Sequence, residues 1–268
     1  MSHANLADYN AQMRHTAGNK LFWLKGINPE DIGLVVDFGC ADANVLKVAS
    51  RLLPDDCSFV GIDKDPSQIA AAKAHFVAAD SLSTDWEMAD QFLNDMQPGK
   101  KSVLVLSSVI HEMGDDFPRW WREEVETRRF DYVAIRDFAR PEYPKGFAGL
   151  SYPRACLTQE EFLALRFTQI KWSHGRSCAG LREGVLHGLL KAVHWEDLER
   201  EHEEDYFRWS VRQMLDVTTS TRLYAFRLNG IDTTITPFFR RWCEKRGIVL
   251  DPTYDKTHVE MLLERRTY

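Results

Sequence analysis

The feature that most constrains this chain is a strand, helix and strand pattern in its first quarter. An apolar run at residues 34–36 is typical of a buried parallel strand, and Asp37 ends it. Apolar residues then recur at helical spacing over residues 45–53, and a second apolar run over residues 58–62 ends at Asp63. This order predicts a right-handed βαβ unit, and therefore an α/β fold built around a parallel sheet.

The loop between the first strand and the helix indicates the kind of ligand. It is expected at the carboxyl edge of the sheet, where a helix amino terminus leaves room for a ligand. A dinucleotide site favours G-x-G-x-x-G, because three glycines let the backbone approach a pyrophosphate. Here the loop has the single glycine Gly39, and the carboxylate of Asp37 precedes it. A carboxylate repels phosphate and suits a cation, and Asp63 can accept hydrogen bonds from ribose hydroxyls, so the pattern favours S-adenosylmethionine over a nicotinamide dinucleotide.

Two motifs in this region resemble those of class I S-adenosylmethionine-dependent methyltransferases. They are DFGCAD at residues 37–42 and GIDKD at residues 61–65, and the resemblance extends from about residue 34 to about residue 138. Members of that family usually carry a second glycine in the first motif, where this chain has Ala41 and Ala43. The resemblance implies a Rossmann-like α/β fold with a seven-stranded sheet, mostly parallel with an antiparallel last strand, and helices on both faces.

Further apolar runs predict the rest of this sheet. In the resembled family the last strand inserts antiparallel between the fifth and the sixth. The third to seventh strands are predicted at residues 76–80, 102–107, 131–138, 222–228 and 257–266.

These signals fit a single class I methyltransferase-like domain over residues 1–268. A helical segment over residues 1–30 precedes the sheet, and a helical insertion covers about residues 157–220. Within that insertion, a strongly charged helix over about residues 194–216 is predicted either to pack on the domain through its aromatic residues or to face a partner.

The resemblance also implies which residues hold the cofactor. The acidic start of the loop binds the methionine part, the acid after the second strand binds the ribose, and an acid after the third strand binds the adenine. Serines after the fourth strand border the sulfonium. The candidate cofactor-binding residues are Lys20, Asp37, Gly39, Cys40, Ala41, Asp63, Lys64, Asp80, Ser107 and Ser108.

Three of these residues have a second interpretation. Lys20 either reaches the cofactor carboxylate or is an ordinary solvated lysine. Asp80 either holds the adenine amino group or caps the next helix. Cys40 is expected to fill space in the loop as a small, nearly apolar side chain rather than to act as a nucleophile.

The segment after the fourth strand occupies the place where class I enzymes meet the methyl group and its acceptor. His111 is the side chain most able to take a proton near neutral pH, and Glu112 either orients it or acts itself. Otherwise His111 caps a helix or lines the cofactor pocket. Arg136 and Asp137 stand at the carboxyl end of the fifth strand, where they either bind the acceptor or form a structural ion pair.

The sequence does not identify the methyl acceptor, but net charge and motifs favour one class of acceptor over others. The formal net charge of −6 gives no general basic field for nucleic acid, and the N-P-P-Y signature of many base-modifying enzymes is missing after the fourth strand. A small-molecule oxygen or nitrogen acceptor is therefore favoured. The alternatives are a nucleic-acid methyltransferase with a local basic cluster, such as residues 240–246, and a non-catalytic module that binds S-adenosylmethionine or another protein.

Neither a metal site nor a membrane segment is predicted. The five cysteines include no C-x-x-C pair, and His187, His194 and His202 lack the spacing of metal ligands. No apolar run is long enough to span a membrane, and the first residues contain no apolar signal core. A cytoplasmic location is expected.

Overall fold

The chain divides into two compact units. The larger holds residues 2–137, 215–232 and 260–268, and the smaller holds mainly residues 138–214 and 233–259. All candidate site residues belong to the larger unit. The computed structural model describes residues 17–76, 80–140, 189–190, 205–226, 232–234, 237–248 and 257–267.

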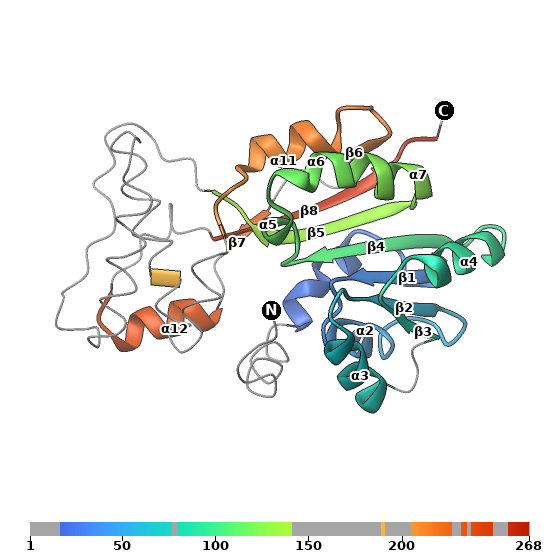
Figure 1. The fold of residues 1–268 in the computed structure, drawn as a ribbon, viewed down its shortest axis with the longest axis horizontal. Helices are drawn as coiled ribbons and strands as arrows, with labels where there is room; N and C mark the ends of the chain where they lie inside the picture. The colour runs from blue at the N-terminus through green and yellow to red at the C-terminus, as the bar shows by residue number, and fades with distance from the viewer. Residues whose placement is uncertain are drawn as a thin grey trace. The chain divides into compact units, whose positions relative to one another are not determined.

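A mixed sheet organises the fold (Figure 1). Its strands follow the order β3-β2-β1-β4-β5-β8-β6, and the short strand β7 also pairs with β8. Strands β1 to β5 pair in parallel, whereas β6 pairs antiparallel with β8. The predicted Rossmann-like fold is confirmed, with the last long strand inserted between β5 and β6. The strands are β1 Ile32–Phe38, β2 Ser58–Ile62, β3 Ser81–Ser83, β4 Lys101–Ser107, β5 Tyr132–Phe138, β6 Tyr224–Phe226, β7 Asp232–Thr234 and β8 His258–Arg265.

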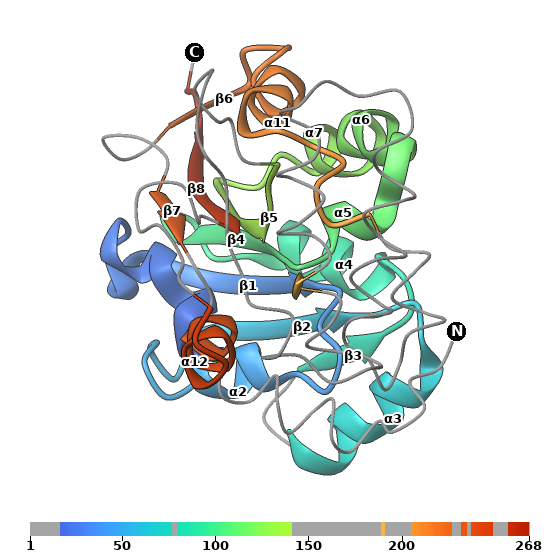
Figure 2. The same ribbon diagram turned by 90° about the vertical axis from the view of Figure 1, so that its left-hand side faces the viewer.

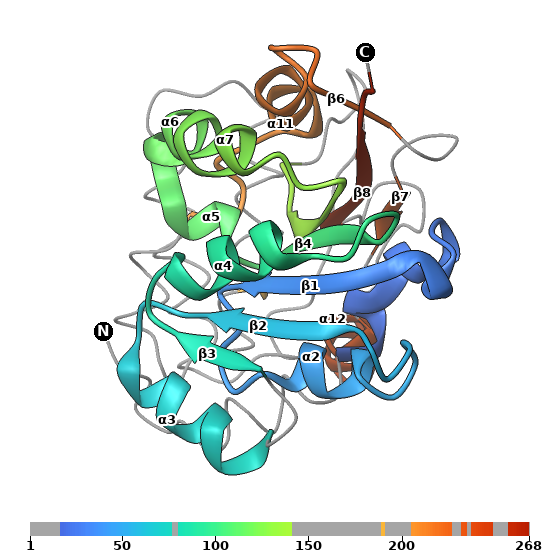
Figure 3. The same ribbon diagram turned by 90° about the vertical axis from the view of Figure 1, so that its right-hand side faces the viewer.

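Short helices connect these strands. Figures 2 and 3 show α2 and α3 near β2 and β3, and α6 and α7 near β5, towards the other end of the strand order. The helices are η1 Ala17–Lys25, η2 Pro29–Asp31, α2 Asn44–Ala49, α3 Pro66–His75, α4 Glu87–Asp95, α5 Ile110–Met113, η3 Gly114–Asp116, α6 Phe117–Trp120, the π-helix η4 Trp121–Val125, α7 Glu126–Arg128, α11 Val211–Thr218 and α12 Pro237–Lys245.

The central strands are buried on both faces, which explains their continuous apolar runs. On one face, Val35 of β1 and Val103 of β4 belong to a buried cluster with Leu46 of α2 and Trp23 of η1. Their neighbours along the strands, such as Leu34, are buried outside that cluster, because successive side chains point to opposite faces. A sheet covered in this way leaves its strand ends as the places where polar side chains can gather.

The prediction of a third strand at residues 76–80 is wrong, because β3 begins at Ser81. Phe76 instead ends α3, with its backbone N–H donating to the Ala72 carbonyl at 2.8 Å. Its ring packs edge-on against Phe59, with ring centroids 6.3 Å apart. The apolar signal at Phe76 therefore belongs to the end of a helix that packs on the sheet, and the strand follows later.

The single-domain organisation stays a prediction. Of the predicted segment 1–30, the described part contains the 3-10 helices η1 and η2. Most of the predicted insertion at about residues 157–220 lies outside the described residues. The charged helix predicted over about residues 194–216 is wrong in its described part, because residues 206–209 form turns and bends and a helix begins only at Val211. The helix α11 lies within the range of that insertion.

Candidate active site

The loop after β1 follows an unusual backbone path. Gly39, Ala41 and Ala43 all have positive φ angles, of 77°, 46° and 58°. A side chain at Gly39 would also crowd Val109, whose Cγ2 lies 3.0 Å from the position of a Cβ. Left-handed backbone favours glycine, so Ala41 and Ala43 adopt a conformation that costs alanine more than it would cost glycine. The loop is therefore left-handed at three positions, only one of which is a glycine.

The amide groups of this loop bond within the protein. The N–H groups of Gly39 and Cys40 both donate to the Ile62 carbonyl, at 2.7 and 3.0 Å. The Ala41 N–H donates to Asp63 Oδ2 at 2.8 Å, and the Ala43 N–H donates to the Cys40 carbonyl at 2.8 Å. A pyrophosphate site needs such amides to point at the phosphates. These four do not, which agrees with the expectation that the loop does not serve a dinucleotide.

The carboxylate of Asp37 is buried at the carboxyl end of β1 without full compensation. Its side chain is 2% exposed, and Oδ2 has no hydrogen-bond partner among the residues that the structure describes. Burial raises the pKa of Asp37 to about 7, Asp63 raises it further, and Lys20 opposes the rise. A buried carboxylate oxygen without a donor is costly, and a cationic ligand would relieve that cost.

Lys20 of η1 lies within electrostatic range of this carboxylate. Its side chain is partly buried. Burial lowers the pKa of Lys20, while Asp37, Asp137 and Asp42 oppose that lowering and Arg136 adds to it. The solvated-lysine interpretation therefore fits the structure less well than a lysine held at the carboxyl edge of the sheet.

Asp63 follows β2 and ties the loop to the next helix. Its Oδ2 accepts from Ala41, and its Oδ1 accepts from the Asp65 N–H at 2.9 Å. Burial raises the pKa of Asp63, and these two hydrogen bonds oppose the rise. Since a carboxylate oxygen has two lone pairs, both oxygens keep capacity for a further donor such as a ribose hydroxyl. The next residue, Lys64, pairs with Glu112, with Nζ 3.0 Å from Oε2.

Asp80 does not join this group. It precedes β3, and its Oδ2 accepts from the Phe59 N–H at 2.7 Å, near the start of β2. In the parallel register Val60 pairs with Ser81, so Asp80 lies at the amino edge of the sheet. The adenine-binding prediction for Asp80 depended on the misplaced third strand and is wrong for that reason.

The acid that follows β3 is Asp85, which the sequence reasoning missed. Ser83 ends the strand, and its carbonyl accepts from the Asp63 N–H at 3.1 Å. Asp85 Oδ1 accepts from the Glu87 N–H at 3.0 Å in the first turn of α4. Counting from the correct strand end would have found it, because Asp85 follows Ser83, the residue whose carbonyl meets the Asp63 N–H.

Ser107 and Ser108 stand where β4 ends. Ser107 Oγ is buried and has no hydrogen-bond partner in the described part of the chain. Ser108 has a φ of 60°, and its N–H donates to the Arg136 carbonyl at 2.8 Å. Two unsatisfied polar atoms, on Asp37 and Ser107, thus lie on neighbouring strands at one edge of the sheet, because β1 pairs with β4.

His111 and Asp137 form a buried pair. His111 Nδ1 lies 2.6 Å from Asp137 Oδ1, and the side chains are 5% and 0% exposed. Asp137 Oδ2 accepts from the N–H groups of Val109 and Ile110, at 2.7 and 2.5 Å. The carboxylate therefore holds both the start of α5 and the imidazole.

Glu112 and Arg136 have other partners. Glu112 pairs with the exposed Lys64, so the residue that orients His111 is Asp137. Arg136 Nε lies 3.3 Å from Glu260 Oε1 of β8, and burial lowers the pKa of Arg136. A role of Arg136 and Asp137 in binding an acceptor stays a prediction, as does a catalytic role of Glu112. The partnership of Asp137 with His111 was readable only from the paired ends of β4 and β5.

Cys40 is a buried thiol. Its side chain is 4% exposed, and a Cβ at Gly61 would lie 2.9 Å from its Sγ. Burial raises the pKa of Cys40, and the nearby carboxylates of Asp37 and Asp63 raise it further. A neutral, packed thiol agrees with the expected space-filling role.

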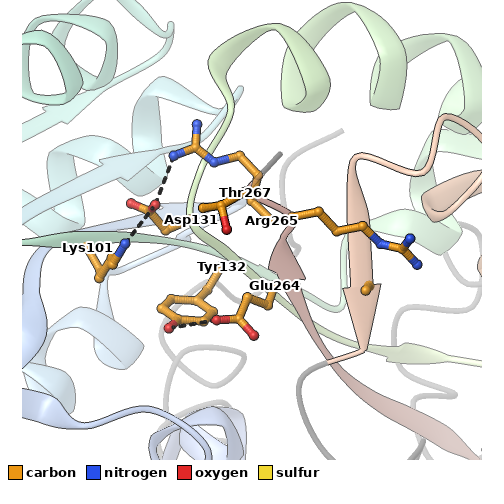
Figure 4. Close-up of a pocket in the computed structure, with 8 residues that line it drawn as sticks. Lys101, Asp131, Tyr132, Glu264, Arg265 and Thr267 are labelled. Atoms are coloured by element: carbon orange, nitrogen blue, oxygen red, sulfur yellow. Dashed lines mark hydrogen bonds and ion pairs between the residues drawn. The ribbon is translucent and has the colours of Figure 1, made fainter.

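A hollow at the other edge of the sheet has a different character (Figure 4). It has a volume of about 400 Å³ and lies where β4 and β5 begin. Figure 4 shows Lys101 and Arg265 directed at Asp131, to which their nitrogens lie at 3.5 and 3.0 Å. Tyr132 donates to Glu264 at 3.3 Å. Both acidic side chains of this hollow thus have partners within the protein.

Membrane-spanning helices and metal-binding clusters are both absent from the described residues. None of their helices has the length and apolar character needed to cross a membrane. No cluster of three or more His, Cys, Asp or Glu side chains among them could hold a metal ion.

Solved structures share this fold, although no family model and no curated protein sequence matches the chain. The plantazolicin methyltransferase BamL, in complex with a desmethyl analogue and S-adenosylhomocysteine, aligns with a TM-score of 0.51 and 9% identity over 98% of this chain and 88% of that chain. Human N-acetylserotonin methyltransferase aligns with a TM-score of 0.49 and 14% identity, over 98% and 56%. A cyclopropane-fatty-acyl-phospholipid synthase-like protein from Lactobacillus casei aligns with a TM-score of 0.48 and 10% identity, over 98% and 96%.

At such low identity the likeness concerns the fold. The strand order, the inserted antiparallel strand and the likeness to BamL together define it. The chain has the fold of class I S-adenosylmethionine-dependent methyltransferases.

Proposed function

We propose that the protein is an S-adenosylmethionine-dependent methyltransferase. The observation that carries the proposal is the buried Asp37 carboxylate, whose Oδ2 has no donor among the described residues and whose pKa is raised to about 7. The ammonium of the cofactor's amino-acid part would supply both a donor and a compensating charge. The fold and the nearby unsatisfied Ser107 hydroxyl support the same ligand.

Each part of the cofactor has a candidate partner at this edge. Asp37 and the loop that begins at Gly39 would hold the amino-acid part, with Lys20 toward its carboxylate. Asp63 would accept from the ribose hydroxyls, and Asp85, the acid that follows β3, would take the place of Asp80 as the partner of the adenine. When bound, S-adenosylmethionine supplies a methyl group attached to an electron-poor sulfonium sulfur.

The acceptor is proposed to be a small molecule with an O–H or N–H group. His111 is a titratable side chain that follows β4, and its buried contact with Asp137 holds the ring in one orientation. A fixed imidazole is suited to remove a proton from a nucleophile. The protein's other task is alignment of that nucleophile with the methyl group.

Calorimetry with S-adenosylhomocysteine tests the cofactor assignment. We expect binding by the wild type, and a loss of affinity of about 10- to 100-fold in Asp63→Ala, because charged hydrogen bonds to the ribose are lost. Asp80→Ala is the matched control: it removes the same side chain at the amino edge and should leave the affinity unchanged. No heat with the wild type, or equal affinity in Asp63→Ala and wild type, would refute the assignment.

Turnover separates an enzyme from a silent binding module. The protein is incubated with methyl-labelled S-adenosylmethionine and the small-molecule fraction of a cell extract, and labelled products are identified by mass spectrometry. A methylated small molecule supports the enzyme. Tight binding of S-adenosylhomocysteine without any product supports the non-catalytic alternative.

A further inference from the structure

We propose that Asp137 is a positioning residue that selects the tautomer of His111 with the proton on Nδ1, so that Nε2 is the proton-accepting nitrogen. This inference rests on the proposed function for its role in turnover. The selection of the tautomer itself is a property of the protein alone.

The geometry divides the Asp137 carboxylate between two tasks. Oδ2 receives two backbone N–H groups, from Val109 and Ile110, at the start of α5. Oδ1 lies 2.6 Å from Nδ1 of His111, the residue that follows Ile110. A carboxylate can only accept hydrogen bonds when it is ionised, so the nitrogen that faces it carries the proton. In a neutral imidazole the other nitrogen, Nε2, then holds the lone pair.

A cap alone would not require this arrangement. One oxygen is enough to accept from the two N–H groups of α5, and an asparagine would serve as well at this position. The second oxygen is placed against an imidazole that is itself buried, with only 5% of its side chain exposed. Because Asp137 fixes the start of α5 and the ring on α5 together, the direction of the imidazole is set by the same group that sets the helix.

The assigned tautomer suits an acceptor whose nucleophilic atom carries a proton. In the proposed step the acceptor's O–H or N–H proton moves to His111 Nε2, and the electron pair that it leaves forms the bond to the methyl carbon. The sulfur keeps the electron pair of the broken S–C bond. The imidazole becomes an imidazolium whose Nδ1–H still faces the Asp137 carboxylate, and that charge pair stabilises it.

The ¹⁵N NMR shifts of the imidazole nitrogens read the tautomer without cofactor or acceptor. Comparison with His111→Gln identifies the His111 signals. In the wild type at slightly alkaline pH we expect a protonated Nδ1 and an unprotonated Nε2. A protonated Nε2, whether in the opposite tautomer or in an imidazolium, would overturn the inference, and this result needs no variant of Asp137.

Asp137→Asn gives the matching perturbation. Its amide oxygen can keep the two N–H groups of α5, which leaves its NH₂ group facing Nδ1 and should move the proton to Nε2. We expect a reversed ¹⁵N pattern, an unchanged affinity for S-adenosylhomocysteine and, on the product found in the extract assay, a fall in kcat of about 10³- to 10⁴-fold with little change in KM. A folded Asp137→Asn protein with the wild-type pattern and kcat would show that Asp137 is a helix cap only.

The two proposals fail in different ways. If S-adenosylhomocysteine does not bind to the wild type, the proposed function fails, while the ¹⁵N result still decides the tautomer. If the cofactor binds and methyl transfer occurs but the tautomer is wrong, the positioning role of Asp137 fails alone.

Discussion

The two edges of the sheet use the same residue type in opposite ways. At the amino edge, Asp131 accepts from the Ser102 N–H at 3.0 Å and pairs with Arg265 and Lys101, and Asp80 accepts from Phe59. At the carboxyl edge, Asp37 is more deeply buried and Oδ2 lacks a partner in the described part of the chain. A carboxylate that the protein satisfies holds the fold together, whereas one that it leaves unsatisfied is available to a ligand.

The largest expected effect comes from Asp37. The pKa is about 7 in the folded protein and about 4 in an unfolded chain, so between these pH values the folded protein holds a proton that the unfolded chain has lost. The free energy of unfolding should therefore fall by about 4 kcal/mol as the pH rises from 4 to 7, from this group alone. Asp37→Asn should remove that dependence and weaken the binding of S-adenosylmethionine. Urea unfolding across this pH range measures the effect, and an identical pH dependence in both proteins would contradict it.

At the amino edge, removal of a carboxylate should lower the stability of the protein and leave ligand binding unchanged. Asp131→Asn keeps the size of the side chain but removes the charge that Arg265 and Lys101 contact at 3.0 and 3.5 Å. We expect a loss of about 2 kcal/mol in the free energy of unfolding at neutral pH, and no change in affinity for S-adenosylhomocysteine. A stable variant with weaker ligand binding would mean that this edge, and not the carboxyl edge, holds the site.

Strand β4 carries one buried serine at each edge of the sheet, Ser102 at the amino edge and Ser107 at the carboxyl edge. Ser102 Oγ donates to Asp131 at 3.2 Å and accepts from the Asp131 N–H at 3.0 Å, whereas Ser107 Oγ has no partner among the described residues. Ser102→Ala should destabilise the protein by about 1 kcal/mol, and Ser107→Ala should stabilise the ligand-free protein by about 1 kcal/mol. Thermal unfolding of both variants checks the sign. Equal destabilisation would show that Ser107 has a partner.

The smallest expected effect concerns the loop. Ala43 has a φ of 58°, which glycine adopts without strain. Ala43→Gly should stabilise the protein by about 0.5 kcal/mol, since the relief of strain exceeds the added entropy of the unfolded chain. Ala49→Gly in α2 is the control and should destabilise by about 1 kcal/mol or more. A similar loss in both variants would mean that the loop is not strained at Ala43.

Local patterns were enough to predict the βαβ unit and the places of Asp37 and Asp63. Each depends on an apolar run that ends at an acid, and a strand end fixes the edge of the sheet to which the acid belongs. Asp80 was assigned wrongly because Phe76 carries an apolar signal that suits both a helix end and a strand. The error in one boundary moved an acid from one edge of the sheet to the other.

The pairing of His111 with Asp137 needed the register between strands. Ser107 pairs with Arg136 across β4 and β5, which brings the residues that follow these strands together. Glu112, adjacent to His111 in sequence, was the nearer candidate, but it pairs with Lys64. Which of two acids meets a histidine is a tertiary property, and the unsatisfied oxygen of Asp37 is likewise visible only once its surroundings are known.

The most direct test is a crystal structure of the protein with S-adenosylhomocysteine. The account predicts the ligand at the carboxyl edge, with its amino group about 3 Å from Asp37 Oδ2 and its ribose hydroxyls on Asp63. A ligand bound in the hollow beside Asp131, or a carboxyl edge that stays without ligand at saturating concentration, would contradict it.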